Sequence, residues 1–200
     1  MPTTTRVLIV QGHPDPRGGH FCHALADAYA AGASEAGHDV ERLDVATLDF
    51  PSIRSRDDLE APAPACIRLA QTMLLHADHV VLCFPIWNGT GPAYLRGFLE
   101  QVFRASFAMP DTRPGERIGF TAYFTRRKSL TGKSARVVAT MAMPAFLYRW
   151  AFRPHVERNT LSVSGLSPIR ESLVGSVEGR QERRRARWLA RMRDLGRRAA

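Results

Sequence analysis

The stretch His79 to Phe84 reads HVVLCF, and the loop after it, Pro85 to Ala93, reads PIWNGTGPA. A nearly continuous apolar run of this length is typical of a central parallel strand that is covered on both faces. The segment Pro92 to Phe103 begins with a proline and carries apolar residues at helical spacing, which predicts a helix. The order is strand, loop and helix, and we expect this strand in the middle of a sheet.

Similar units occur along the rest of the chain. Further strands are predicted at 6–11, 39–44, 136–141 and 172–177. Helices are predicted at 21–36, at about 66–76 and, near the C-terminus, at about 179–198. Strands that alternate with helices at this spacing predict an α/β fold with a doubly wound parallel sheet and right-handed crossovers.

Length and composition favour one domain over residues 1–200, because 200 residues with 44% hydrophobic content suffice for one well-buried core. The N-terminus shows no export signal, and the longest apolar runs fall far below the roughly 20 residues of a spanning helix. The three cysteines are scattered without CxxC spacing, so neither a disulfide framework nor a metal site is expected. We therefore expect a soluble cytoplasmic protein.

The net charge of +9 is concentrated near the C-terminus, where residues 178–200 hold nine arginines against three acidic residues. Trp188, Leu189, Met192 and Leu195 form one apolar stripe on this segment, which predicts a basic amphipathic helix. The simplest interpretation is a helix that packs on the sheet with a solvated basic face. Weak association with a membrane or a membrane protein is the alternative. Nucleic-acid binding is not expected, because the loops lack interleaved aromatic and basic residues.

Ligands of such sheets bind beyond the carboxyl ends of the strands, which directs attention to the loops after Gln11, Phe84 and Met141. The first loop reads GHPDPRGGH at 12–20 and leads into a helix at Phe21. Unpaired N–H groups at a helix start favour a phosphate. The residues expected to bind it are His13, Arg17, His20, Phe21 and Cys22. A plain strand-to-helix turn is the competing interpretation.

The second loop combines a large aromatic residue, Trp87, with free backbone amides. A planar heterocycle needs both an apolar face to stack on and N–H donors along its polar edge. Trp87 could instead be an ordinary core residue, and composition alone favours that interpretation.

The residues around this loop resemble the flavin-loop signature of the NAD(P)H:quinone oxidoreductases. The matching segments are FPIW at 84–87, PAYLRGF at 92–98 and EQVF at 100–103. Other segments resemble the same family in the correct order over nearly the whole chain, from GHP at 12–14 to the end of the C-terminal helix.

The resemblance implies a flavodoxin-like three-layer sandwich with strand order 2-1-3-4-5. It also implies bound FMN or FAD, NADH or NADPH as reductant, two-electron transfer to a quinone-like acceptor, and a homodimer. The residues that then fall along the isoalloxazine ring are Pro85, Ile86, Trp87, Asn88 and Gly89. The third loop contributes Thr140, Met141, Ala142 and Met143, where many family members have T-x-G-G.

Tyr148 and His155 fall where the family has a tyrosine and a histidine that accompany electron delivery, and both can supply a proton to a reduced acceptor. The competing interpretation is a packed aromatic helix around Tyr148 with His155 exposed behind it. A second function is also implied by the resemblance, since one branch of the group serves as flavin-binding regulatory subunits of potassium-efflux systems. The basic C-terminal helix would then be a docking surface.

Overall fold

The computed structural model describes residues 4–112, 125–151, 156–179 and 182–200. Within these residues, five strands form one sheet in which every pair is parallel, in the order β2-β1-β3-β4-β5. The strands are β1 (Arg6–Gln11), β2 (Asp39–Asp44), β3 (His79–Pro85), β4 (Ser134–Thr140) and β5 (Ile169–Val174). The predicted fold class and strand order are confirmed.

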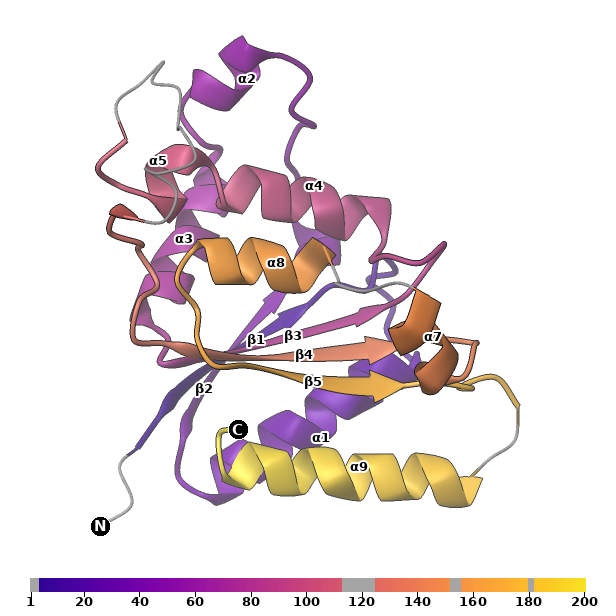
Figure 1. Cartoon of the computed structure of the whole chain (residues 1–200). Helices are drawn as coiled ribbons and strands as arrows, with labels where there is room; N and C mark the ends of the chain where they lie inside the picture. Colours follow the sequence, from indigo (N-terminus) through magenta and orange to yellow (C-terminus); the bar gives the residue numbers. More distant parts are fainter. Residues whose placement is uncertain (1–3, 113–124, 152–155, 180–181) are drawn as a thin grey trace.

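Helices cover both faces of the sheet, which gives the three predicted layers (Figure 1). On one face lie α1 (Phe21–Glu35) and α9 (Glu182–Arg197), and on the other lie α3 (Ala65–His76), α4 (Ala93–Val102) and α8 (Val156–Val163). The shorter helical elements are η1 (Val45–Thr47), α2 (Arg56–Glu60), α5 (Ala105–Ala108) and α7 (Ala145–Ala151). In Figure 1, α7 lies beside the carboxyl ends of β4 and β5.

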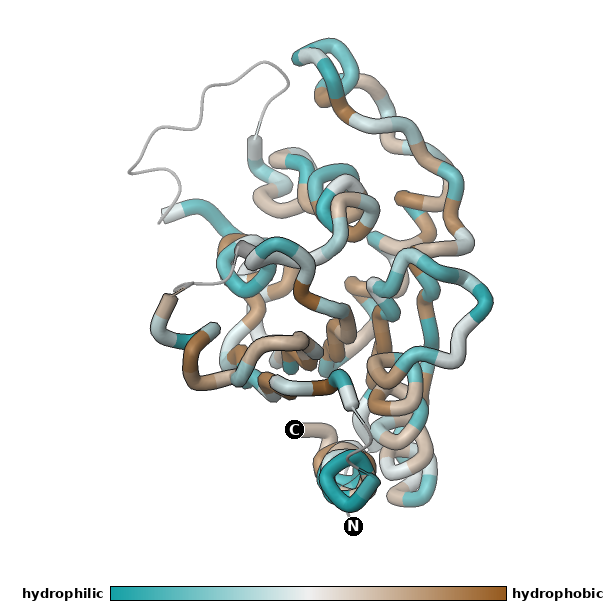
Figure 2. Tube along the Cα trace, turned by 90° about the vertical axis from the view of Figure 1, so that its right-hand side faces the viewer, coloured by the Kyte–Doolittle hydropathy of each residue, from teal (hydrophilic) through white to brown (hydrophobic). Residues whose placement is uncertain are grey.

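The central strands carry long apolar runs because each face of the sheet has its own core. Val7 and Ile9 of β1 pack with α1 and α9, whereas Leu8 and Val10 pack with the helices on the other face. Successive side chains of a strand point to opposite faces, so a strand covered on both sides needs an unbroken apolar run. Figure 2 shows the result, with hydrophobic segments inside and hydrophilic residues along the outer loops.

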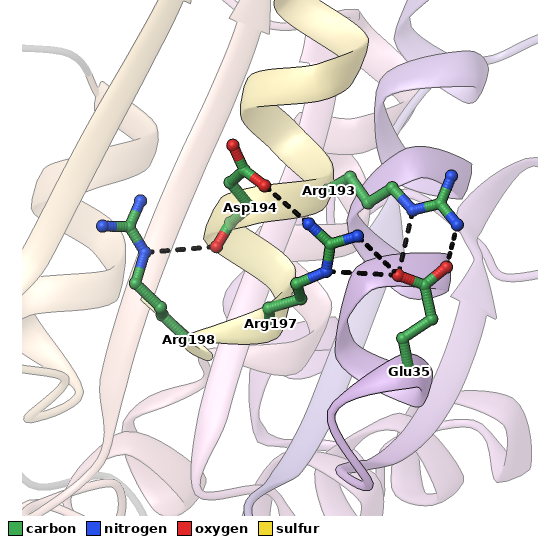
Figure 3. A network of polar contacts seen from close by, with 5 residues as sticks. All are labelled: Glu35, Arg193, Asp194, Arg197 and Arg198. Carbon is green, nitrogen blue, oxygen red and sulfur yellow. Dashed lines mark hydrogen bonds and ion pairs between the residues drawn. The ribbon is translucent and has the colours of Figure 1, made fainter.

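The basic helix α9 packs on α1 at very close range. Gly32 of α1 faces the backbone of Arg193, and Gly196 of α9 faces the backbone of Tyr29, so neither position has room for a side chain. Met192 and Leu195 are buried in the same contact. At its edge, Glu35 accepts hydrogen bonds from Arg193 and Arg197 (Figure 3).

One predicted strand is displaced. The sequence placed it at 172–177, but β5 runs Ile169–Val174, because its register is set by pairing with β4 from Ala135 to Thr140. The chain beyond β5 instead turns back toward the end of β4, where the amides of Ser176 and Val177 donate to the carbonyls of Met143 and Met141.

None of the helices described in the structure combines the length and the apolar character needed to cross a membrane.

Candidate functional site

The three loops singled out in the sequence meet at one edge of the sheet, because β1, β3 and β4 are neighbours. Backbone hydrogen bonds connect the start of each of two loops to the end of a neighbouring strand or the loop after it. The Gly12 amide donates to the Cys83 carbonyl and the Ile86 amide donates to the Thr140 carbonyl, each at 2.7 Å. The first, second and third loops therefore leave the sheet side by side.

The first loop ends at a helix start that no side chain caps. His20 is the N-cap residue of α1, and its side chain makes no capping hydrogen bond. The first N–H groups of a helix have no acceptor within the helix, so those of Phe21 and Cys22 are placed to bind an anion. The structure thus offers at this position what a phosphate requires.

Three histidine rings gather beside this helix start. The His13 and His20 rings stack with centroids 3.9 Å apart, and the His23 ring centroid lies 5.0 Å from that of His13. Neither ring nitrogen of His23 has a hydrogen-bond partner among the described residues. Burial and then the His20 and His23 rings lower the pKa of His13 to about 4, and burial followed by His20 lowers the pKa of His23. Without an anion, His13 is therefore neutral near pH 7.

Arg17 is held by a residue of its own loop. Its guanidinium donates to both carboxylate oxygens of Asp15 at 2.9 Å, while the other face of the cation is exposed. His20 also contacts this carboxylate at 3.1 Å. These hydrogen bonds, those from Arg17 first, keep the pKa of Asp15 well below its usual range.

At the start of α1, the backbone amide of Cys22 is free to bind a ligand, whereas its thiol is buried. The side chain is buried, and its Sγ lies 3.4 Å from Oε1 of Gln11. Burial raises the pKa of the thiol to about 12, so it is not a nucleophile at neutral pH.

The second loop is a tight turn with an exposed indole at its base. Trp87 and Thr90 exchange two backbone hydrogen bonds, at 2.7 and 3.1 Å, across Asn88 and Gly89. Both central residues have positive φ, 50° and 84° respectively. A turn of this kind requires asparagine and glycine, which the sequence supplies. Trp87 is 50% exposed and its ring lies edge-on to His13 with centroids 6.0 Å apart, so the core interpretation is wrong.

Two buried residues from later in the chain hold this turn in place. The Tyr148 hydroxyl of α7 donates to the Gly89 carbonyl at 2.9 Å. From α8, Glu157 accepts hydrogen bonds from the Thr90 hydroxyl and the Gly91 amide, each at 2.7 Å. Sequence reasoning missed Glu157, since no local pattern marks it.

The third loop contributes less free backbone than the sequence suggested. Thr140 and Met141 are buried, whereas Ala142 and Met143 are exposed. The Met141 amide donates to Val174 and its carbonyl accepts from Val177, so both groups are already used. The assignment of Thr140, Met141, Ala142 and Met143 to the edge of a flavin ring stays a prediction.

The two predicted proton donors are Tyr148 and His155. Tyr148 is fully buried, and burial followed by the nearby Glu157 raises the pKa of its phenol to about 12. Its hydroxyl proton is directed at Gly89. His155 lies outside the described residues. Among the residues that are described, no group of three or more histidine, cysteine or acidic side chains could hold a metal ion.

Comparison with known proteins places this geometry in a family. A family model described as "Flavodoxin-like fold" matches residues 5–195. The chain belongs to this family. The solved structure of the NAD(P)H:quinone oxidoreductase from Methanothermobacter marburgensis is similar, with a TM-score of 0.76 at 21% identity over 98% of this chain and 96% of the other. At 21% identity, this similarity shows a shared fold and nothing further.

Two other relatives are similar to this chain in sequence. The ribosyldihydronicotinamide dehydrogenase-like protein traD of Penicillium crustosum is 29% identical over 68% of this chain. The FMN-dependent NADH:quinone oxidoreductase of Ruegeria pomeroyi is 28% identical over 62% of this chain. The matches span 57% and 65% of the relatives, which is less than two thirds of their length.

Proposed function

We propose that this protein is a flavin-dependent NAD(P)H oxidoreductase that reduces quinones or similar small electrophilic acceptors by two electrons. One observation carries the proposal. An uncapped helix start and a turn that exposes Trp87 lie side by side at the carboxyl edge of the sheet. A flavin has the same two parts, a phosphate and a planar ring.

The phosphate of the flavin would bind at the start of α1. The amides of Phe21 and Cys22 would donate to its oxygens, with the histidine rings beside it. A dianion favours the protonated form of a nearby histidine. His13 and His20 would then add charge-assisted hydrogen bonds to those of the backbone. Arg17 keeps exposed N–H groups that remain available to the anion.

The ring would lie along the second loop. Trp87 offers an apolar face, and residues Pro85 to Gly89 would run along the ring. The amides of Asn88 and Gly89 would be its donors, because those of Ile86 and Trp87 already donate to Thr140 and Thr90. Thr140 to Met143 would border the same site, which the hydrogen bond from the Ile86 amide to the Thr140 carbonyl supports. Tyr148 maintains the turn through Gly89.

A bound flavin supplies hydride transfer from NAD(P)H to the acceptor. The chain binds the cofactor, orients it and shields it from water on the side of the sheet. A proton must reach the reduced acceptor, and we assign its delivery to His155, the residue to which the family resemblance gives this role. The buried Tyr148 hydroxyl, which donates to Gly89, supports the loop that would hold the ring. We favour FMN over FAD, because the relative from Ruegeria pomeroyi is FMN-dependent.

We further propose a homodimer, supported by exposed apolar residues on α7. Phe146 and Trp150 are 72% and 84% exposed, and both line a surface hollow of about 450 Å³. Such a patch is typical of a protein contact. The alternative of an ion-efflux subunit docked through α9 has less support, since Arg193 and Arg197 already pair with Glu35.

Flavin titration of site variants tests the proposal. We expect the Trp87→Ala variant to bind FMN about tenfold more weakly, because an aromatic contact contributes roughly 1 kcal/mol beyond the area it buries. Leu69→Ala, which removes an exposed apolar side chain from α3, is the matched control and should bind as wild type does. Equal affinity of all three proteins would contradict the assignment of the ring to the second loop.

A further inference from the structure

A buried carboxylate lies directly behind the turn that exposes Trp87. Glu157 is in the first turn of α8, and only 1% of its surface is exposed. Burial of a charged group is costly unless it is compensated. The positive end of the α8 dipole favours an acidic residue at this position. No arginine, lysine or histidine of the described residues forms an ion pair with it.

The carboxylate is committed to the loop. Its Oε1 accepts from the Thr90 hydroxyl and the Gly91 amide, both at 2.7 Å, whereas Oε2 has no hydrogen-bond partner among the described residues. Hydrogen bonds to an ionised acceptor are about twice as strong as neutral ones. Within the described part of the chain, Glu157 therefore forms hydrogen bonds with Thr90 and Gly91 alone, the two residues that close the turn.

The residue at position 91 must be small for this contact to form. A Cβ on Gly91 would lie 2.9 Å from Oε1 of Glu157 and 3.2 Å from the Phe84 ring. A larger residue would push the carboxylate away from the amide that it accepts from. The backbone of the loop and the side chain of α8 thus fit each other closely.

With the hydrogen bonds to Glu157, three elements of the fold are hydrogen-bonded to this one short loop. Ile86 is bound to Thr140 of β4, Gly89 to Tyr148 of α7, and Thr90 with Gly91 to Glu157 of α8. The first lies at the entry of the loop, the second at its tip and the third at its exit. Loss of the third would free the side of the turn that includes Thr90, the residue paired with Trp87.

We propose that Glu157 is a positioning residue, whose carboxylate fixes residues 85–91 in the conformation that receives the isoalloxazine ring. The last step rests on the proposed function. The negative charge of Glu157 would also disfavour electron uptake by a ring bound at this loop, because like charges repel. Glu157 therefore acts on the cofactor through the loop and through its charge.

Two variants and a control test this role. Glu157→Gln keeps an acceptor oxygen of the same shape but removes the charge, and Thr90→Val removes one donor. Glu100→Gln, an exposed carboxylate on α4, is the matched control. We expect backbone amides of residues 86–91 to exchange hydrogen about five to ten times faster in Glu157→Gln without flavin. Thr90→Val should show a smaller increase, and Glu100→Gln none.

The cofactor gives two further measurements. FMN should bind about tenfold more weakly to Glu157→Gln, and the midpoint potential of the bound flavin should rise. A residue that only supported the fold would leave this potential unchanged. Wild-type exchange rates, affinity and potential in Glu157→Gln would overturn the inference. If wild-type protein bound no flavin, the proposed function would fail, and the exchange rates would still decide whether Glu157 holds the loop.

Discussion

The close crossing of α1 and α9 permits a sharp test, in which one substitution has opposite effects at two helical glycines. A Cβ on Gly32 would lie 1.9 Å from the Arg193 carbonyl oxygen, whereas one on Gly97 would lie 3.7 Å from the Phe50 ring. Alanine is a better helix former than glycine by about 1 kcal/mol. Gly97→Ala should keep this gain, and Gly32→Ala should lose it to steric overlap.

The magnitude follows from the displacement that each site needs. Ordinary contact begins near 3.4 Å, so α9 must move from 1.9 Å to that distance, about 1.5 Å away from α1. Overpacking of this kind typically costs about 1–3 kcal/mol, and Met192 and Leu195 would lose part of their burial as well. We expect a net loss of about 2 kcal/mol or more in the free energy of unfolding.

Urea and thermal unfolding of the protein without flavin measure both effects, because a bound ligand would add to the apparent stability. At about 2–4 °C per kcal/mol for this chain length, Gly32→Ala should lower Tm by about 4–8 °C and Gly97→Ala should raise it by up to about 4 °C. A Gly32→Ala variant as stable as wild type would refute the close packing of α9 on α1.

Three other predictions follow from the charges and the surface. Burial lowers the pKa of His79 to about 4, so the stability present above pH 6.5 is lost as pH falls to 4, by at most about 3 kcal/mol. His79→Asn should make the urea midpoint less dependent on pH over this range. FMN should bind more tightly as pH falls from 7 toward 5, because its phosphate raises the pKa of His13. Riboflavin titrated in parallel should show no such dependence, and equal pH profiles for the two ligands would exclude a role of His13 in binding the phosphate. Replacing Phe146 and Trp150 by serine should shift sedimentation from dimer to monomer, and an unchanged dimer would place the contact elsewhere.

Much of the fold could be predicted from the sequence because its central strands are locally unambiguous. Val7 to Val10 and Val80 to Phe84 are apolar on both faces, which is typical of buried parallel strands. The fifth strand was misplaced by three residues. Val174 and Val177 look alike in the sequence, and only pairing with β4 decides that the strand ends at the first of them.

The candidate site was predicted only where loops follow strands directly. His13, His20 and Trp87 meet because their loops leave adjacent strands, and strand order places such loops together. Glu157 lies 66 residues after Gly91 in the chain, and its position depends on how α8 packs on the sheet. Pairing at that distance leaves no local pattern in a single sequence.

The most direct test of the flavin assignment is a complete redox cycle in one cuvette. Purified protein loaded with FMN should carry about one flavin per chain that remains bound on gel filtration. NADH or NADPH added without oxygen should bleach the flavin absorbance, and a quinone should restore it. Protein that retains neither FMN nor FAD, or whose bound flavin is not reduced by either nucleotide, would contradict the proposed function.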